Sequence, residues 1–393
     1  MKKMTGLPRQ NETKDNLQAS SCGKLYKIKV KYCLSCMMVV VFILPSLFGN
    51  DTRVNGSKAG VLEAYELRIS GKAEKAEELL NELLKNDSTN ALAYFELART
   101  KHHVFLGGTQ FSSEEWGKVM SNLQQAVRYA PDNETYAFYY AYSCFFNAFI
   151  SMMREQSDVN ENIARACDAF QAVLDKHPDC YVAQLYLVDI YGSLPENIGG
   201  NKEKAAAIAA DLNKKDNIFG AMANARVLPD TTNFVLYWQN TGKKCGTSAQ
   251  VLEETGRAYL LKSDTENGTK YFEEAMKADA SKNYLYMQLA RYHLLATQQD
   301  PAAKTAHLQS ATALVNKYME TCPDLVPSLK AYTYGILSIL KMIDGDNNGS
   351  SEYSEMATAI DPYYSKAMGM APDMLYCRPE DVTIKYSSFF MPF

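Results

Sequence analysis

The most complete chemical motif in this 393-residue sequence is a calcium-loop pattern. Residues 344–349, followed by Glu355, satisfy D-x-[DN]-x-[DN]-G-x5-E, which supplies alternating oxygen ligands, a glycine for the sharp bend and a closing carboxylate. Loop position eight is normally a branched apolar residue, but here it is Ser351. Residues 264–268 have similar composition without the full ligand set, because Asp, Asn and Gly suit turns generally. We therefore interpret residues 344–355 as a structural turn, with calcium binding as the alternative.

Two arginines at a regular spacing could hold an anion. Arg257 and Arg291 are 34 residues apart, and a pair of guanidinium groups can clamp a carboxylate or phosphate through charge-assisted hydrogen bonds. In the alternative interpretation these side chains are solvated or pair with neighbouring acids such as Glu253.

Motifs of the common enzyme classes are missing from the sequence. It has no GxxxxGK[ST] phosphate loop, no HExxH zinc helix and no GxSxG nucleophile elbow. The five histidines are not spaced for a catalytic or metal site, and the adjacent His102 and His103 would point to different sides of a helix. We predict a protein that is not an enzyme and has no cofactor and no metal site.

Six cysteines follow residue 49, and none of them forms a CxxC pair. An even number in an exported chain permits disulfides, and Cys144 and Cys167 could meet across one helical hairpin. A large helical core does not need such bonds, so we favour buried thiols.

An internal repeat determines the elements that must position these residues. Residues 249–282 read as one unit of helix, turn and helix, with Gly256 on the first helix facing Phe272 on the second. Shifting the sequence by 34 residues places residues 256–261 on residues 290–295, so the first helix recurs. This period, with its small residue opposite an aromatic one, resembles the tetratricopeptide repeat.

Read with this period, the chain is predicted to be all-α, a right-handed solenoid of about eight antiparallel helix pairs. The repeats span residues 57–362, and residues 217–242 read as a degenerate fifth pair. The tail, residues 363–393, ends in a hydrophobic stretch, and we expect it to cap the last repeat by covering its open apolar face.

The resemblance also implies a binding groove. In that family the first helices line the concave side, and positions two, five and nine of each repeat point into it. Carried over, position nine of the first repeat is Tyr65, and position five of the sixth is Glu253. The candidate ligand-binding residues on this face are Arg99, Tyr142, Asp189, Arg257, Arg291, Tyr284, Met287 and Tyr332.

A second resemblance concerns residues 194–201, Leu-Pro-Glu-Asn-Ile-Gly-Gly-Asn. This stretch looks like one in the T component associated with TRAP-type transporters, and it implies an alternative function as a small-solute-binding accessory subunit of a transporter. A proline that stops one helix, a glycine pair that permits positive φ, and Asn201 as the cap of the next helix would explain the stretch by structure alone.

The first 49 residues indicate export. Four lysines between residues 24 and 31 precede an apolar run at residues 32–48, which is short for a transmembrane helix. We interpret residues 1–49 as a signal peptide cleaved near Gly49, or as an uncleaved signal anchor that associates the protein with the membrane. Neither Cys22 nor Cys36 follows an apolar run, which disfavours lipid attachment.

Charge disfavours a nucleic-acid partner. Removing 8 basic and 2 acidic residues before position 50 leaves 33 basic and 43 acidic residues, a formal net charge of −10, which opposes binding to a phosphate backbone. We predict an exported, non-catalytic scaffold, periplasmic or in the cell envelope, that binds a protein or peptide partner. The sequence leaves the partner's identity and the oligomeric state open.

Overall fold

The computed structural model describes residues 52–108, 112–363 and 375–384, and its regular structure there is entirely helical. Three short 3-10 turns, η2 (Glu196–Ile198), η3 (Ala280–Tyr284) and η4 (Pro301–Ala303), accompany the α-helices. The sixteen described α-helices are α2 (Thr52–Ile69), α3 (Ala73–Asn86), α4 (Ala91–Leu106), α5 (Ser113–Tyr129), α6 (Glu134–Met153), α7 (Val159–Lys176), α8 (Tyr181–Ser193), α9 (Lys202–Lys215), α10 (Asn217–Val227), α11 (Phe234–Cys245), α12 (Ala249–Leu260), α13 (Thr265–Ala278), α14 (Leu285–Gln299), α15 (Lys304–Thr321), α16 (Pro327–Asp344) and α17 (Asn347–Ile360).

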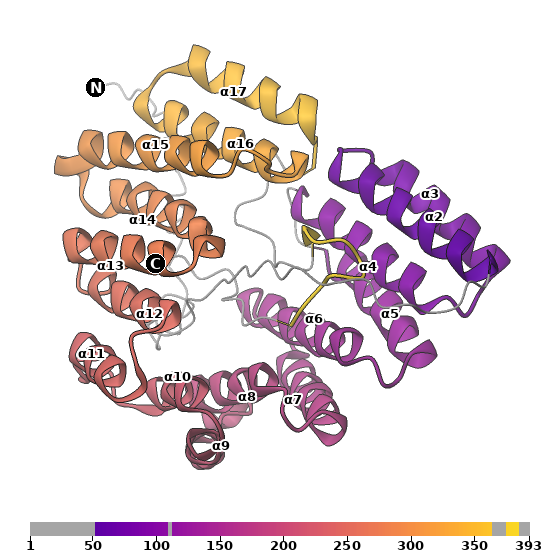
Figure 1. Ribbon diagram of the computed structural model, residues 1–393, viewed down its shortest axis with the longest axis horizontal. Coiled ribbons are helices and arrows are strands. Elements are labelled where there is room, and N and C mark those ends of the chain that lie inside the picture. Colours follow the sequence, from indigo (N-terminus) through magenta and orange to yellow (C-terminus); the bar gives the residue numbers. More distant parts are fainter. Residues whose placement is uncertain (1–51, 109–111, 364–374, 385–393) are drawn as a thin grey trace, which may run out of the picture.

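The helices pack mainly in sequential antiparallel pairs, which confirms the all-α repeat fold predicted from the sequence. Polar side chains cap many helix starts: Asn90 accepts from Ala93 N at 3.0 Å, and Asn133 accepts from Tyr136 N at 3.0 Å. First and second helices differ in burial. Most of α8 is buried, whereas α9 buries only the stripe Ala205, Ala209 and Leu212. The first helices accordingly lie toward the inside of the array (Figure 1).

The two helices predicted within residues 217–242 are present, but they do not pack as a pair. Helix α10 packs against α8 and α9, whereas α11 packs against α12. Gly220 makes the first contact possible, because a Cβ there would lie 2.3 Å from the Asn213 Cα of α9. The prediction of a fifth hairpin was therefore wrong in its packing, and the two helices are shared between their neighbours.

The array of pairs bends until its two ends meet (Figure 1). The Ser328 hydroxyl at the start of α16 lies 3.1 Å from the Ile69 carbonyl at the end of α2, and 2.7 Å from the Asp361 carboxylate. The same carboxylate lies 2.8 Å from His103 Nε2 of α4. Ser328, Asp361 and His103 are all buried, so the first and last repeats pack against each other without solvent between these groups.

The described part of the tail contacts the first repeats. Residues 375–384 lie against α2, α4 and α6, where Figure 1 shows the tail in yellow. The sequence predicts that the tail covers the last repeat, whereas this part of it contacts the first three repeats. Residues 364–374 and 385–393 lie outside the described residues, as does the predicted export segment, residues 1–49.

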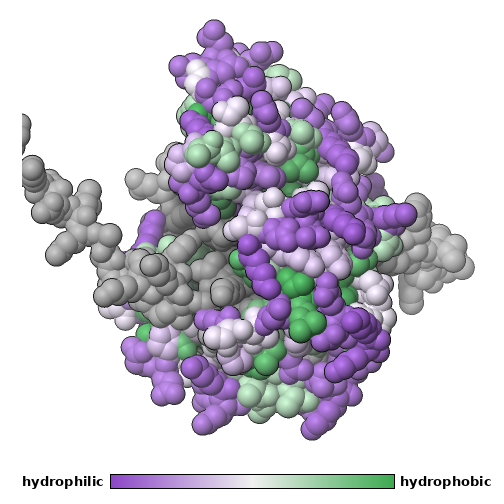
Figure 2. All heavy atoms as spheres, turned by 90° about the vertical axis from the view of Figure 1, so that its left-hand side faces the viewer, coloured by the Kyte–Doolittle hydropathy of each residue, from purple (hydrophilic) through white to green (hydrophobic). Residues whose placement is uncertain are grey.

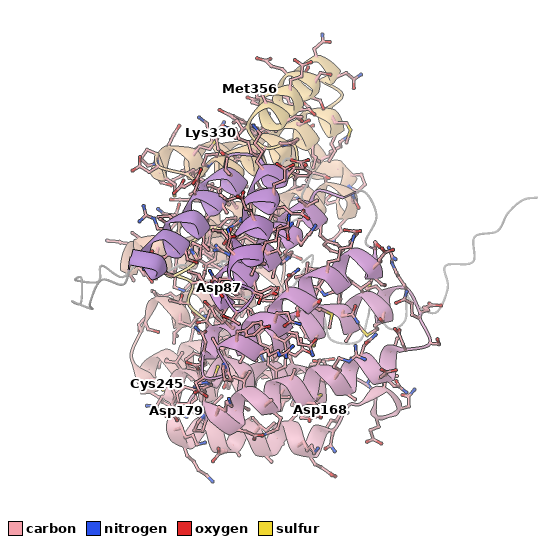
Figure 3. The ribbon with its side chains drawn as sticks, turned by 90° about the vertical axis from the view of Figure 1, so that its right-hand side faces the viewer. Asp87, Asp168, Asp179, Cys245, Lys330 and Met356 are labelled. Carbon is pink, nitrogen blue, oxygen red and sulfur yellow. The ribbon has the colours of Figure 1, made fainter. Side chains whose placement is uncertain are left out.

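Polar residues dominate the outer surface. The face shown in Figure 2 is mostly hydrophilic with scattered apolar groups, and Asp87, Asp168 and Asp179 are exposed at the outside of their repeats (Figure 3). The large apolar side chains that are exposed in the described ranges are Met153, Leu236, Met342 and Met356. Of the helices in these ranges, none combines the length and the apolar character that crossing a bilayer requires.

Candidate binding groove on the inner face

The inner face of the first three repeats holds the tail through its backbone. Tyr65 Oη of α2 donates to the Tyr376 carbonyl at 2.6 Å, and Arg68 Nη1 donates to the Leu375 carbonyl at 2.8 Å. Arg99 of α4 donates to the Cys377 carbonyl, and Tyr139 Oη of α6 donates to the Thr383 carbonyl at 3.0 Å. Four side chains from three first helices thus bind four carbonyls of one segment.

A buried charge network sets the direction of the two guanidinium groups. Glu96 accepts from Arg68 Nε at 2.8 Å and from Arg99 Nη1 at 2.6 Å, and all three side chains are fully buried. Burial lowers the pKa of Arg99 to about 10, with Glu96 opposing the shift, so Arg99 is charged at neutral pH. One carboxylate cannot satisfy all the donors of two guanidiniums, and one further nitrogen of each arginine, Arg68 Nη1 and Arg99 Nη2, binds a tail carbonyl.

A second buried network lies on the sixth and seventh repeats. Glu253 accepts from Arg257 one helical turn away, from Lys282 Nζ at 2.6 Å and from Tyr284 Oη at 3.0 Å. Burial acts to raise the pKa of Glu253, but Arg257 and Lys282 outweigh it and lower that pKa. The carboxylate is therefore ionised, and two cations surround it, as at Glu96.

The structure assigns most of the predicted groove residues to packing or ion pairs. Arg257 pairs with Glu253, as the alternative to a ligand clamp predicted, and Asp189 accepts from Arg226 Nε at 2.8 Å. Arg291 is half-buried. The remaining predicted residues are Arg99 and Tyr284, which belong to the two networks above, and Tyr142, Met287 and Tyr332, which are buried in the core.

Arg68, Glu96 and Tyr139 are not among the groove residues that the sequence predicts. A usable signal was present at Glu96 and Arg99, which stand three residues apart inside the otherwise apolar start of α4. Charged residues in a buried helix are paired, so this spacing indicates a buried ion pair. The partner Arg68 is on another helix, and its position becomes apparent only when α2 and α4 are packed together.

Residues 194–201 form a connection between α8 and α9. Gly199 adopts a positive φ of 95°, and Asn201 caps α9 by accepting from Lys204 N at 2.9 Å. The turn geometry therefore explains why these residue types occur in the stretch that resembles the transporter component, as the structural interpretation predicted.

The calcium-loop pattern, which the sequence indicates to be a turn over residues 344–355, is mostly helical, and the turn is confined to residues 345 and 346. Residues from Asn347 onward belong to α17, and the Asp346 carboxylate caps that helix by accepting from Gly349 N at 2.9 Å. Lys341 Nζ lies 2.9 Å from the same carboxylate. Within the described ranges, no group of three or more His, Cys, Asp or Glu side chains is arranged to hold a metal ion.

Tertiary packing joins two histidines that are separated in sequence. His293 Nδ1 and His307 Nδ1 lie 2.9 Å apart across the hairpin of α14 and α15, so one ring donates to the other. The six cysteines beyond residue 49 are free thiols, and they include Cys144 and Cys167. Only Cys144 and Cys180 are buried, whereas Cys245 is exposed (Figure 3) and the other three are half-buried, which corrects the expectation of buried thiols.

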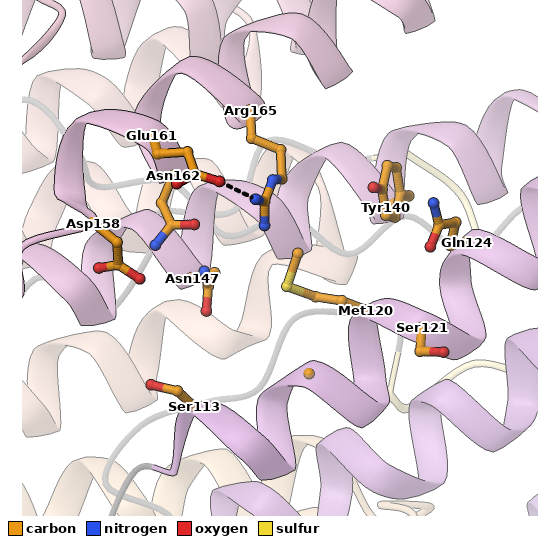
Figure 4. Close-up of a pocket in the computed structure, with 11 residues that line it drawn as sticks. Ser113, Met120, Ser121, Gln124, Tyr140, Asn147, Asp158, Glu161, Asn162 and Arg165 are labelled. Carbon is orange, nitrogen blue, oxygen red and sulfur yellow. Dashed lines mark hydrogen bonds and ion pairs between the residues drawn. The ribbon is translucent and has the colours of Figure 1, made fainter.

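An open cleft of about 500 Å³ lies between α5, α6 and α7 (Figure 4). Arg165 and Glu161, which are both exposed, form an ion pair at 2.7 Å on one side of this cleft. Met120 and Tyr140 add apolar surface to a lining that is mainly polar, and none of the predicted groove residues belongs to it. The cleft is therefore a separate, solvated region of the surface.

His102 provides a test of the buried core around the groove. Its ring meets Trp116 edge-on with the centroids 4.9 Å apart, and both of its nitrogens are buried without a hydrogen-bond partner. Burial lowers the pKa of His102 to about 3, so the folded chain stays neutral there while the unfolded chain binds a proton below about pH 6.5. As the pH falls from about 6.5 to about 3, the contribution of His102 to the free energy of unfolding therefore decreases by about 1.4 kcal/mol per pH unit.

We predict that His102→Phe is at least as stable as the parent at neutral pH and increasingly more stable than the parent as the pH falls below about 6. Phenylalanine keeps the aromatic contact and removes both unpaired nitrogens. Urea unfolding at neutral pH and at about pH 5 measures the difference. Parallel pH profiles for the two chains would contradict the assignment of His102 as a buried neutral side chain.

The comparisons with known proteins concern the fold. A tetratricopeptide repeat protein from Parabacteroides merdae ATCC 43184 matches with a TM-score of 0.39 and 12% identity, over 72% of this chain and 99% of that chain. The C-terminal part of a TPR repeat-containing protein from Cytophaga hutchinsonii matches with a TM-score of 0.25 and 15% identity, over 79% of this chain and 100% of that chain. Yeast Tom70 matches with a TM-score of 0.28 and 12% identity, over 78% of this chain and 77% of that chain. No protein-family model matches the sequence, and no curated protein is significantly similar to it.

Proposed function

We propose that this protein is a non-catalytic scaffold that binds a segment of a partner protein on the inner face of its first three repeats. The observation that supports this proposal is the set of four side chains, Tyr65, Arg68, Arg99 and Tyr139, that bind backbone carbonyls of residues 375–384. Backbone carbonyls are common to all peptides, so the same donors are able to hold a segment of another chain. Stacked helical repeats commonly use such extended inner surfaces for binding.

The buried charge network makes this face suited to peptide binding. Glu96 fixes both guanidiniums before any segment arrives, so little side-chain freedom is lost on binding. The two guanidinium donors, Arg68 and Arg99, are charged and shielded from water, which strengthens their hydrogen bonds to the carbonyls.

The test uses a synthetic peptide with the sequence of residues 375–384 and a variant in which the tail is loosened by Tyr376→Ala and Val382→Ala. The loosened tail is needed because a tethered segment acts at a millimolar effective concentration and would outcompete a free peptide. We expect the labelled peptide to bind the variant saturably in a fluorescence-anisotropy titration. Failure to bind, with the variant folded by circular dichroism, would refute the proposed function.

A further substitution locates the binding face. Adding Tyr139→Phe removes one donor and keeps the ring, so affinity should fall by about twofold to tenfold. Tyr334→Phe on α16 is the matched control, since its ring stacks on Tyr353 of α17, and it should leave the affinity unchanged. Equal effects of the two substitutions would place the peptide elsewhere.

We also propose that the chain is exported, which rests on the lysines before the apolar run at residues 32–48. In a Gram-negative host the mature chain should be found in the periplasm or envelope and should be digested by protease added to spheroplasts. Protection from the protease together with a cytoplasmic location would contradict export.

A further inference from the structure

The tail inserts a spaced set of side chains into the inner face. Leu375 is 1% exposed, Tyr376 is 6% exposed and Val382 is 7% exposed, and Pro379 is also buried. Leu375, Tyr376 and Val382 belong to the same continuous apolar core as the inner helices. Between the buried residues, Cys377 is half-buried, and the exposed positions are Arg378, Glu380 and Asp381.

A turn sets the spacing of the buried positions. Asp381 N donates to the Arg378 carbonyl at 3.0 Å, which closes a four-residue turn with Pro379 in its second position. Proline is favoured there because its fixed φ matches the turn. Tyr376 and Val382 can therefore both reach the protein although the chain between them turns outward.

The contacts of this segment divide into two kinds. The carbonyls bound by Tyr65, Arg68, Arg99 and Tyr139 fix where the backbone lies, and they are independent of the peptide's sequence. The buried side chains fill fixed positions along the same face, so they depend on the sequence. Lys58 Nζ also lies 2.9 Å from Glu380, but both side chains are partly exposed, and such a pair contributes little.

We infer that the inner face of the first three repeats selects partner segments with the pattern aliphatic-Tyr-x-x-Pro-x-x-aliphatic, where x is any residue, and that the chain's own tail is an internal competitor at this site. This inference rests on the proposed function and adds the chemistry of the partner to it. A partner segment displaces the tail by presenting the same apolar groups at the same spacing. The exposed positions of the pattern carry no selectivity.

The experiment titrates the loosened-tail chain (Tyr376→Ala, Val382→Ala) with a series of peptides based on residues 375–384. Alanine in place of the buried Tyr376 or Val382 within the peptide should weaken binding about tenfold or more. Alanine in place of the exposed Arg378 or Asp381 serves as the matched control and should change the affinity less than about twofold. The parent chain, whose tail is intact, should bind every peptide more weakly than the loosened chain does.

The outcomes separate the two proposals. If all the peptides bind with equal affinity, the groove reads only the backbone, so the inferred pattern is wrong while the proposed function stands. If no peptide binds, both are wrong. If the parent chain binds as tightly as the loosened chain, the tail is not a competitor. Should the double substitution prevent folding, the single Val382→Ala chain is titrated with the same series and judged by the same criteria.

Discussion

Replacing Glu253 with alanine should lower the free energy of unfolding by about 3 to 5 kcal/mol, because the change leaves Arg257 and Lys282 as buried cations without their shared partner. Denaturant unfolding of parent and variant measures this loss. The lowered pKa of Glu253 also predicts how stability depends on pH. Its carboxylate contributes stability above its ordinary pKa, and this contribution is lost as the pH falls through the folded pKa. The variant should therefore be less sensitive to acid than the parent.

Glu161→Ala is the matched control for Glu253→Ala. Glu161 pairs with Arg165 at the same spacing of four residues, but both side chains are exposed. Exposed pairs on a helix contribute about 0.3 to 0.5 kcal/mol, so the control should be close to the parent. A Glu253→Ala chain that is no less stable than the control would show that the second network is not buried in solution.

Replacing Gly256 with leucine should destabilise the protein by about 1 to 3 kcal/mol. A Cβ at this position would lie 2.4 Å from Phe272 Cδ1 and 3.1 Å from the Gly268 carbonyl, so even the first side-chain atom must displace the facing helix. Leucine has the better helix propensity by somewhat under ~1 kcal/mol, which acts in the opposite direction. The sign of the measured change therefore decides between packing and propensity.

Gly117→Leu on α5 supplies the comparison for Gly256→Leu. No atom lies within 4 Å of a Cβ at Gly117, and the residue is exposed, so only the gain in helix propensity remains. Thermal unfolding should show a higher melting temperature for Gly117→Leu and a lower one for Gly256→Leu. If both variants were stabilised, α12 and α13 would not be in close contact, and the repeat register would have to be abandoned.

The sequence alone determined the local architecture of this protein. The 34-residue period predicted helix pairs, and the pairing of Gly256 with Phe272 across one hairpin is confirmed by the space that a Cβ would need. The cap at Asn201 was equally predictable, because it binds the backbone only three residues away. These features depend on neighbours in sequence or on one repeated interface, and a pattern of residue types can encode both.

Tertiary structure alone decided where the ends of the array and the tail lie. Ser328 meets Ile69, and Arg68 meets Leu375, across separations of 259 and 307 residues. Small rotations between successive pairs accumulate along the array, and no single pair records their sum, so the period cannot predict that the first and last repeats meet. The same accumulation brings the tail to α2, α4 and α6, where Arg68 and Arg99 have donors left over from Glu96. The groove and its occupant are therefore properties of the closed array, because separate helix pairs do not bring these groups together.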